Sequence, residues 1–346
     1  MTANLADEPA KLALIGIRTD QGAFMSRTLR ALLVGAALTA LAACAGMETA
    51  TPALESAAPP TTSTAYAQLI DDLRILSADD MEGRDTGAPG GERARAYIVS
   101  RLEALGVAAP PMGRLQPWEM QGRTREGPRT FNGVNVLGVI PGTRATDRYI
   151  VITAHYDHVG IADGLIHNGA DDNASGVATA LEIAARLKAA QPEHSVIFAF
   201  LDGEERGLLG ARHFVEAPPV PLSSIALNLN FDMTARAETD MKLWVTGTYQ
   251  NPTLRPLLEP VAAENGVALA FGKDTPQDTG NNNWVEASDH AAFYRAGLPF
   301  LYLGVDYHPD YHRPTDDFDK VNPAIFAAAT ELSWRSFQAL DRGLDR

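Results

Sequence analysis

Cysteine and positive charge are both scarce in this sequence. Cys44 is the only cysteine among 346 residues, so a disulfide framework is excluded and the folded part must be stable through its core alone. The 29 Lys and Arg residues face 43 Asp and Glu residues, which gives a formal net charge of −14. A surface this acidic repels phosphate backbones and argues against nucleic acid as a partner. The remaining composition is typical of a globular protein.

A long apolar run is missing as well. The apolar stretch at residues 31–41 is too short to cross a bilayer as a stable helix. It follows the basic segment Met25–Arg30, a layout typical of a secretory signal, and translation is expected to begin at Met25. The stretch ends in Leu41-Ala-Ala-Cys44, which resembles a bacterial lipobox, where the cysteine becomes the lipidated N-terminus. An ordinary signal peptide with a chance cysteine is the alternative.

The chain is therefore expected to have three parts. Residues 1–44 are predicted to be a leader and lipoprotein signal peptide, and residues 45–65, with their prolines and Thr/Ser run, a flexible tether. Residues 66–346 contain no internal repeat and no natural break, which predicts one domain. A lipid on Cys44 would anchor this exported domain to a membrane. Ala45 resembles the residue found in lipoproteins sorted to the outer membrane, so its periplasmic face is the expected location.

Apolar runs of strand length alternate with helical patterns along the domain. Residues 107–131 lack clear periodicity and are expected to form a surface hairpin or an irregular loop. The alternation elsewhere predicts an α/β fold with a mostly parallel central sheet flanked by helices. Strands are predicted at residues 136–140, 149–154, 196–201, 225–231, 242–246, 268–271 and 300–303, and helices at residues 66–76, 92–105, 174–190, 205–215, 252–265, from 288, and 322–340.

Acidic and imidazole side chains follow directly after three of the predicted strands. In an open α/β sheet the carboxyl ends of the strands are where ligands bind, so these side chains are expected to converge. Any one cluster alone is compatible with a solvated loop, but repetition at successive strand ends favours a site. The side chains are His155, Asp157, Asp202, Glu204, Glu205 and Asp232.

A glycine-flanked acidic loop at residues 168–177 opens onto an apolar helix and adds Asp172 to this set. A well-capped helix is the alternative interpretation of the loop. Histidine with several carboxylates and no thiolate suits a hard or borderline divalent ion. One imidazole cannot complete such a site. A second is available in the proline-bounded loop after the last strand, where His308 and His312 are both candidates and spacing does not choose between them.

The order of these motifs resembles that of the M28 zinc peptidases, over roughly residues 66–340. The resemblance implies the zinc-exopeptidase (phosphorylase/hydrolase-like) architecture, peptide substrates and two zinc ions per chain. The matching motifs are His155-x-Asp157, Gly169-Ala-x-Asp172-Asn-x-Ser-Gly176, Glu204-Glu205, Asp232-Met233 and His312.

The same resemblance implies a role for each matching residue. Asp172 would bridge the two ions, His155 and Asp232 would complete one of them, and Glu205 and His312 the other. Glu204 would be the general base, because its neighbour's side chain diverges and leaves it free to accept a proton from water. Asp157 would orient the imidazole of His155, as carboxylates commonly do for zinc ligands.

Other polar residues are expected to have structural or substrate-facing positions. Ser288-Asp289-His290 resembles a turn on the substrate side of these peptidases, because consecutive residues cannot form a triad. Some members carry a tyrosine three residues before this serine, where Val285 stands here, so the donor to the oxyanion is unassigned. Asp171 and Asp202 are predicted to be structural, and the surface or core-edge histidines to be His158, His167, His194 and His213.

The leading hypothesis is a metal-dependent exopeptidase that removes N-terminal residues, because clustered carboxylates attract a substrate's α-ammonium group. Asn228, Asn230 and Glu286 are further candidate acceptors for that amine. Arg313 beside His312 could instead receive a substrate carboxylate, so a carboxypeptidase or dipeptidase is an alternative. A glutaminyl-cyclase-like acyltransferase and a non-catalytic binding protein are the others. Side-chain preference and oligomeric state leave no mark in the sequence.

Overall fold

The computed structural model describes residues 66–124, 127–144 and 147–345, all within one compact unit that spans residues 57–346. The predicted signal peptide and tether lie outside the described residues. Within the described part of the chain, no helix combines the length and the apolar character needed to cross a membrane.

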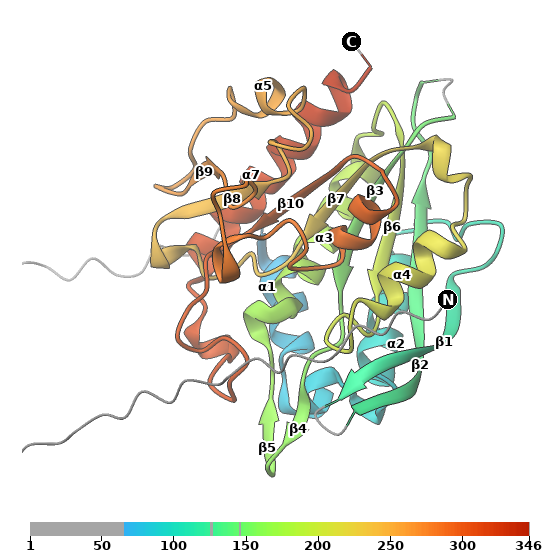
Figure 1. The fold of residues 1–346 in the computed structure, drawn as a ribbon, viewed down its shortest axis with the longest axis vertical. Helices are drawn as coiled ribbons and strands as arrows, with labels where there is room; N and C mark the ends of the chain where they lie inside the picture. Colours follow the sequence, from blue (N-terminus) through green and yellow to red (C-terminus); the bar gives the residue numbers. More distant parts are fainter. Residues whose placement is uncertain (1–65, 125–126, 145–146, 346) are drawn as a thin grey trace, which may run out of the picture. The chain divides into compact units, whose positions relative to one another are not determined.

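A mixed sheet of eight strands forms the centre of the domain, in the order β1-β2-β6-β3-β7-β10-β8-β9 (Figure 1). β3 pairs in parallel with β6 and β7, and β7 pairs in parallel with β10, whereas β1 and β2 run antiparallel at one edge. This arrangement confirms the predicted α/β fold with a mostly parallel sheet. The strands are β1 (Leu115–Thr124), β2 (Gly127–Ile140), β3 (Tyr149–His155), β6 (Ser195–Leu201), β7 (Ile225–Phe231), β8 (Lys242–Thr246), β9 (Ala268–Phe271) and β10 (Phe300–Gly304).

Helices cover both faces of the sheet. One face packs against α1 (Ala67–Leu76), α2 (Pro89–Ala104), α3 (Gly176–Ala189) and α7 (Pro323–Gly343), and the other against α4 (Leu209–Glu216) and α6 (His290–Arg295). Figure 1 shows α4 and α6 in front of the strands. Successive side chains of a strand point to opposite faces, so alternate residues of β6 enter the two apolar clusters. A strand buried on both faces therefore appears in the sequence as a continuous apolar run.

Two segments differ most from the sequence prediction, and a third confirms one of its alternatives. The helix expected at residues 252–265 is reduced to α5 (Arg255–Leu258), because Pro260 cannot donate the next helical hydrogen bond and restricts the residue before it. Residues 107–131 contain β1, which is paired with β2 as an edge hairpin of the main sheet, so the hairpin alternative predicted for this segment is confirmed. A short hairpin of β4 (Gly160–Ala162) and β5 (Leu165–His167) was not expected, although its Asp-Gly turn at residues 163–164 is a strong hairpin signal.

Candidate metal centre

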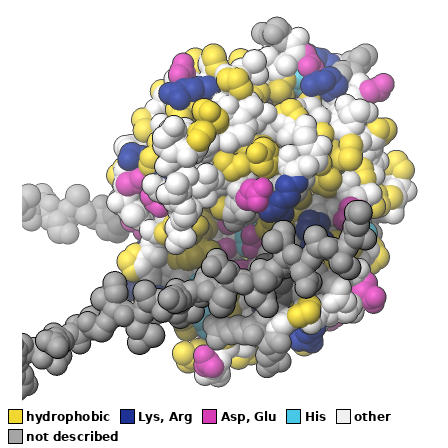
Figure 2. Space-filling model, viewed as in Figure 1, with side chains coloured by type: hydrophobic (Ala, Val, Ile, Leu, Met, Phe, Trp, Pro, Cys, Tyr) yellow, Lys and Arg dark blue, Asp and Glu magenta, His cyan; other side chains and the backbone are white. Residues whose placement is uncertain are grey.

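The predicted site residues lie at the carboxyl edge of the parallel strands. β3 ends at His155, β6 is followed by Glu204 and Glu205, and β7 is followed by Asp232. The turn before α3 and the loop after β10 bring further side chains to the same edge, as the ion pairs below show. Figure 2 shows a hollow in this face of the molecule in which Asp, Glu and His side chains are visible.

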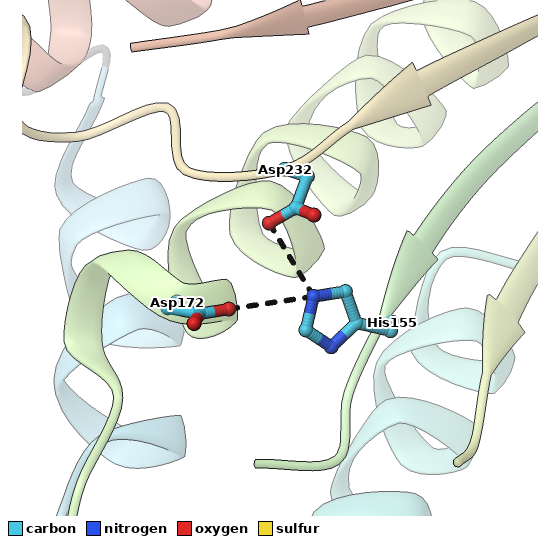
Figure 3. A group of neighbouring side chains, drawn as sticks. All are labelled: His155, Asp172 and Asp232. Carbon is cyan, nitrogen blue, oxygen red and sulfur yellow. Dashed lines mark ion pairs between the residues drawn. The ribbon is translucent and has the colours of Figure 1, made fainter. Parts of the chain in front are cut away.

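His155 meets two carboxylates. Its Nε2 lies 3.4 Å from Oδ1 of Asp172 and 3.3 Å from Oδ1 of Asp232 (Figure 3). The other ring nitrogen, Nδ1, lies 3.1 Å from the backbone oxygen of Asp157, which fixes the ring so that Nε2 faces the carboxylates. All three side chains come from different segments and are almost fully buried.

A second group gathers around the other oxygen of Asp172. Nε2 of His312 lies 3.0 Å from Oδ2 of Asp172 and 3.2 Å from Oε1 of Glu205. Nε2 of His308 is 3.1 Å from Oδ2 of Asp171 instead. The structure thus brings His312 to the carboxylates and separates His308 from them, a choice that spacing alone did not make. Asp172 contributes one oxygen to each group.

His158 is a member of this second group that sequence reasoning missed. We expected a surface or core-edge histidine, yet it is fully buried and its Nδ1 lies 2.9 Å from Oε1 of Glu205 and 3.7 Å from Oδ2 of Asp172. The only signal in the sequence was that His158 lies three residues after His155. This spacing does not show where the side chain points, because its direction depends on the turn after β3.

These side chains fit divalent cations. His155, Asp172 and Asp232 offer three ligand atoms within 4.8 Å of one another, and so do His158, Asp172 and Glu205 within the second group, so Asp172 belongs to both sets. Several of the atoms are buried without a hydrogen-bond partner among the described residues, including Nε2 of His155, Oδ1 of Asp232 and Oε1 of Glu205. Buried polar atoms are normally paired, so such a set indicates a missing partner. Imidazole nitrogens and carboxylate oxygens are the donors that zinc accepts.

The charges of the two groups are strongly coupled. Burial opposes a charge on His312, but Asp172 and Glu205 outweigh it and raise the pKa of the imidazole to about 11. Burial likewise opposes a charge on His155, and Asp232 and Asp172 raise its pKa well above the usual value. Burial also opposes ionisation of Asp172, yet the pKa of this carboxyl is held well below its usual range by His155 and His312. The shared carboxylate therefore stays ionised.

Glu204 differs from its neighbour Glu205. Burial, reinforced by the negative charge of Glu205, raises the pKa of Glu204 well above its usual value, although His155 opposes the shift. Burial and the negative charge of Asp172 oppose ionisation of Glu205, but the adjacent imidazoles of His158 and His312 outweigh them and lower its pKa to about 2. One carboxylate is thus suited to hold a cation and the adjacent one to exchange a proton.

Asp157 contacts the backbone of the two glutamates. Its carboxylate accepts hydrogen bonds from the backbone amides of Glu204 at 3.0 Å and Glu205 at 3.3 Å, and from the hydroxyl of Thr86 at 3.2 Å. It lies 3.7 Å from Nδ1 of His155, beyond hydrogen-bond distance. The expected orienting contact to His155 comes from the backbone oxygen of Asp157, whereas its carboxylate fixes the loop that carries Glu204 and Glu205.

The turn at Ala170–Ser175 positions Asp172. Oδ1 of Asn173 accepts hydrogen bonds from the amides of Gly176 at 2.9 Å and Met233 at 3.1 Å, so Asn173 occupies the capping role expected of the acidic loop. The carboxylate of Asp172 is left free to face the histidines. A side chain at Gly176 would approach the backbone oxygen of Phe231 to 2.4 Å, which explains why this position requires glycine.

Asp171 and Asp316 support the same turn from behind. Oδ1 of Asp171 accepts a hydrogen bond from the amide of Ala235 at 2.7 Å. The carboxylate of Asp316 accepts hydrogen bonds from the amides of Asp171 and Asp172, each at 3.1 Å. These contacts are structural, as expected for Asp171. Asp202 is also structural, because its carboxylate accepts hydrogen bonds from the amide of Val134 and the hydroxyl of Tyr156.

Arg84 is a second residue that sequence reasoning missed. Its side chain has no exposure to solvent, and burial lowers its pKa to about 10. Among the described residues, the guanidinium donates only to backbone oxygens, which belong to three separate segments. These acceptors are Leu76 at 2.7 Å, Tyr156 at 2.8 Å, Asn168 at 2.5 Å, Gly169 at 2.9 Å and Asp172 at 3.4 Å. Arg84 thus ties the segment after His155 to the turn that carries Asp172.

The residues expected on the substrate side have mixed positions. Asn228 and Asn230 are fully buried and bond to neighbouring strands, so they cannot receive a substrate amine. Glu286 is exposed and pairs with Arg295. Asp289 is fully buried beside the site, neither of its oxygens has a described hydrogen-bond partner, and burial raises its pKa to about 7. A cavity over the carboxylates is lined by the aromatic side chains of Trp284, Tyr302, Tyr307 and Tyr311.

Comparisons with known proteins identify relatives of this chain. A probable lipoprotein aminopeptidase of Mycobacterium tuberculosis is 30% identical over 285 residues, which cover 72% of this chain and 53% of that protein. A leupeptin-inactivating enzyme of Streptomyces exfoliatus is 26% identical over 291 residues, which cover 82% of this chain and 59% of that protein. The chain thus spans little more than half the length of each of these curated relatives.

Solved structures show the same fold. A zinc aminopeptidase of Bacillus subtilis superposes with a TM-score of 0.62 at 17% identity, covering 79% of this chain and 94% of that one. A glutaminyl cyclase of Porphyromonas gingivalis superposes with a TM-score of 0.59 at 17% identity, covering 80% of this chain and 96% of that one. The sequence pattern of peptidase family M28 matches residues 135–336, more than half of the chain and the whole span of the predicted ligands. The chain therefore belongs to peptidase family M28.

Proposed function

We propose that this protein is a zinc-dependent aminopeptidase that binds two zinc ions and removes N-terminal residues from peptides. The observation that carries the proposal is the position of Asp172, whose two oxygens face two separate groups of imidazoles and carboxylates. A carboxylate shared in this way suits a two-metal site. The names of the similar proteins support the same activity.

Five residues would hold the two ions. His155 and Asp232 would bind one, Glu205 and His312 the other, and Asp172 both. When bound, zinc would supply an acidified water and polarise the carbonyl of the peptide bond that is cleaved. His158 contacts the carboxylate of Glu205 and would fix its orientation.

Glu204 is the proposed general base. Its side chain lines the cavity over the carboxylates, and its raised pKa matches a group that must both accept and release a proton. In the proposed reaction it takes a proton from the attacking water and transfers it to the departing amine, so that the base is regenerated in each cycle. Asp157 would assist by holding the backbone of Glu204.

The polarity of cleavage follows from charge. Bound zinc ions would balance the charges of Asp172 and Asp232, so Glu204, which lines the same cavity, is the carboxyl group left there to attract a free α-ammonium, whereas a carboxylate is repelled by it. Asp289 adds a buried carboxyl beside this set. An aminopeptidase is therefore favoured over a carboxypeptidase.

The test combines metal analysis with a set of matched peptides. One short peptide is prepared with its N-terminus free or acetylated and its C-terminus free or amidated, and zinc is counted in the purified protein. We expect about two zinc ions per chain, loss of cleavage on acetylation, and tolerance of amidation. The opposite pattern would indicate a carboxypeptidase. Cyclisation of an N-terminal glutamine without hydrolysis would indicate an acyltransferase, and no reaction with any peptide would leave a binding protein.

We also propose that Cys44 carries a lipid that anchors the domain at the periplasmic face of the outer membrane. The lipobox-like sequence that ends at Cys44 supports this proposal. So does the similarity to a relative named as a lipoprotein aminopeptidase. The signal peptide, the tether over residues 45–65 and the domain from residue 66 remain the proposed division of the chain.

A further inference from the structure

A basic groove lies beside the loop that carries Glu204 and Glu205. Its volume is ≈ 440 Å³, and its walls are the β1–β2 hairpin, the residues directly after Glu205, and helices α4 and α6. Its lining includes Arg206, Arg212 and Arg295 and, among the described residues, no Asp or Glu. In a chain with a formal net charge of −14, this groove is a local concentration of positive charge.

One tight turn separates the groove from the proposed base. The backbone oxygen of Glu204 accepts hydrogen bonds from the amides of Gly207 and Leu208, each at 2.9 Å, and both of these residues line the groove. Glu204 itself lines the cavity over the metal-binding carboxylates. Figure 2 likewise shows Lys and Arg side chains beside the hollow that contains Asp, Glu and His side chains. The groove is therefore an extension of the substrate-binding face.

The three arginines differ in how far their charges are compensated. Arg206 pairs with Asp85, although its Nε is buried without a described hydrogen-bond partner. Arg295 pairs with Glu286 at 2.7 Å, in an exposed ion pair that solvent weakens. Arg212 is half-buried, and its side chain has no ion pair or hydrogen bond with the described residues. Arg212 therefore offers the groove a complete, uncompensated positive charge.

We propose that this groove binds a carboxylate of the substrate on the C-terminal side of the cleaved bond, so that acidic peptides are preferred. The inference rests on the proposed aminopeptidase function, since a peptide whose first residue lies in the site must extend over a neighbouring surface. Two to four extended residues span roughly 7–14 Å, enough to pass the turn at Gly207. The carboxylate comes from an Asp or Glu side chain or from the C-terminus of a short peptide.

The experiment uses the full-length, zinc-loaded protein and four tetrapeptides. They share an N-terminal leucine, carry Glu or Gln at the third position, and have a free or amidated C-terminus. Leucine p-nitroanilide, which ends before the groove, reports the basal activity. Each substrate is assayed with the unchanged protein and with Arg212→Gln, Arg295→Gln and Arg342→Gln. Arg342 is exposed in the last turn of α7 and controls for the loss of one positive charge elsewhere.

We expect the peptide with a free C-terminus and Glu to have a kcat/KM about 3- to 10-fold above that of the doubly neutral peptide, as for an ion pair near the surface. Arg212→Gln should remove this preference through KM and leave kcat and p-nitroanilide cleavage unchanged, because the contact is the same in the ground and transition states. The preference should also fall with added salt. Whichever neutralisation abolishes it, Glu→Gln or amidation, identifies the bound carboxylate.

Two results would overturn the inference. One is equal kcat/KM for all four tetrapeptides, and the other is an acidic preference that survives both Arg212→Gln and Arg295→Gln or is lost equally in Arg342→Gln. Failure of the proposed function looks different, because neither the tetrapeptides nor leucine p-nitroanilide would then be cleaved by the unchanged protein.

Discussion

Arg84→Met should be among the most destabilising single substitutions in this domain. Methionine approximates the length of the arginine side chain and removes its five donors. Five buried backbone oxygens would then lose a charged partner, four of them at 2.5–2.9 Å and one at 3.4 Å. Because these oxygens belong to segments that carry Tyr156 and Asp172, the change loosens the site as well as the core.

The magnitude follows from two opposing contributions. A hydrogen bond from a charged donor is worth about 1.5 kcal/mol at the low end, so the five bonds together contribute about 7 kcal/mol. The second contribution has the opposite sign, because the variant no longer buries a charge and this raises the free energy of unfolding. The fall of the pKa of Arg84 from 12.5 to about 10 is equivalent to about 3.5 kcal/mol, at roughly 1.4 kcal/mol for each pKa unit. The expected net loss in the free energy of unfolding is about 4 kcal/mol, a large share of a typical 5–15 kcal/mol.

Urea denaturation of the metal-free protein at pH 7, followed by tryptophan fluorescence, measures this loss. Arg114→Met is the matched control, because Arg114 is half-buried and donates to two backbone oxygens, those of Val107 at 2.6 Å and Leu137 at 3.0 Å. Its two hydrogen bonds contribute at most about 3 kcal/mol by the same count, and solvent weakens them at a half-buried side chain, so the control should cost about 1–2 kcal/mol. The reasoning would be refuted if Arg84→Met cost less than about 1 kcal/mol or no more than the control.

Four further predictions concern the proposed metal site and anchor. Asp172→Ala should lose both zinc ions in a metal count, and two retained ions would contradict the shared carboxylate. Glu204→Gln should keep the zinc but lower kcat by about two to four orders of magnitude, whereas Glu205→Gln should lower zinc occupancy; reversed phenotypes would exchange the two roles. The pKa of His312 is raised from 6.5 to about 11, so the stability due to its proton is complete below pH 6.5 and lost towards pH 11. Zinc must displace that proton at pH 7, and its affinity should rise about tenfold per pH unit between pH 7 and pH 9; calorimetry that finds no proton release would contradict this. Cys44→Ser should move the protein from the membrane pellet to the supernatant, and continued pelleting would disprove the lipid anchor.

The sheet and the family were predictable because they depend on local patterns. Buried strands give continuous apolar runs, and the residues after β3, β6 and β7 are polar where ligands bind, so His155 and Asp232 could be named in advance. The predictions that failed concern residues whose role depends on where the side chain points or on partners far away in the sequence. His158 was misplaced because a turn decides where its ring points, and Arg84 was overlooked because its acceptors are backbone oxygens that any sequence possesses. Prolines at residues 256 and 260, which were visible in the sequence, should have shortened the helix expected at residues 252–265.

The dispersion of the site along the chain has a consequence for how the protein matures. The side chains that face the two groups come from five segments between residues 155 and 312, and none of these segments brings more than two of them. An unfolded chain therefore has no binding site of this kind, and the energy of metal binding becomes available only once the strands have paired. If the chain crosses a membrane unfolded, it must find its zinc on the far side. The site would then be filled only after export and folding, from the zinc present in that compartment.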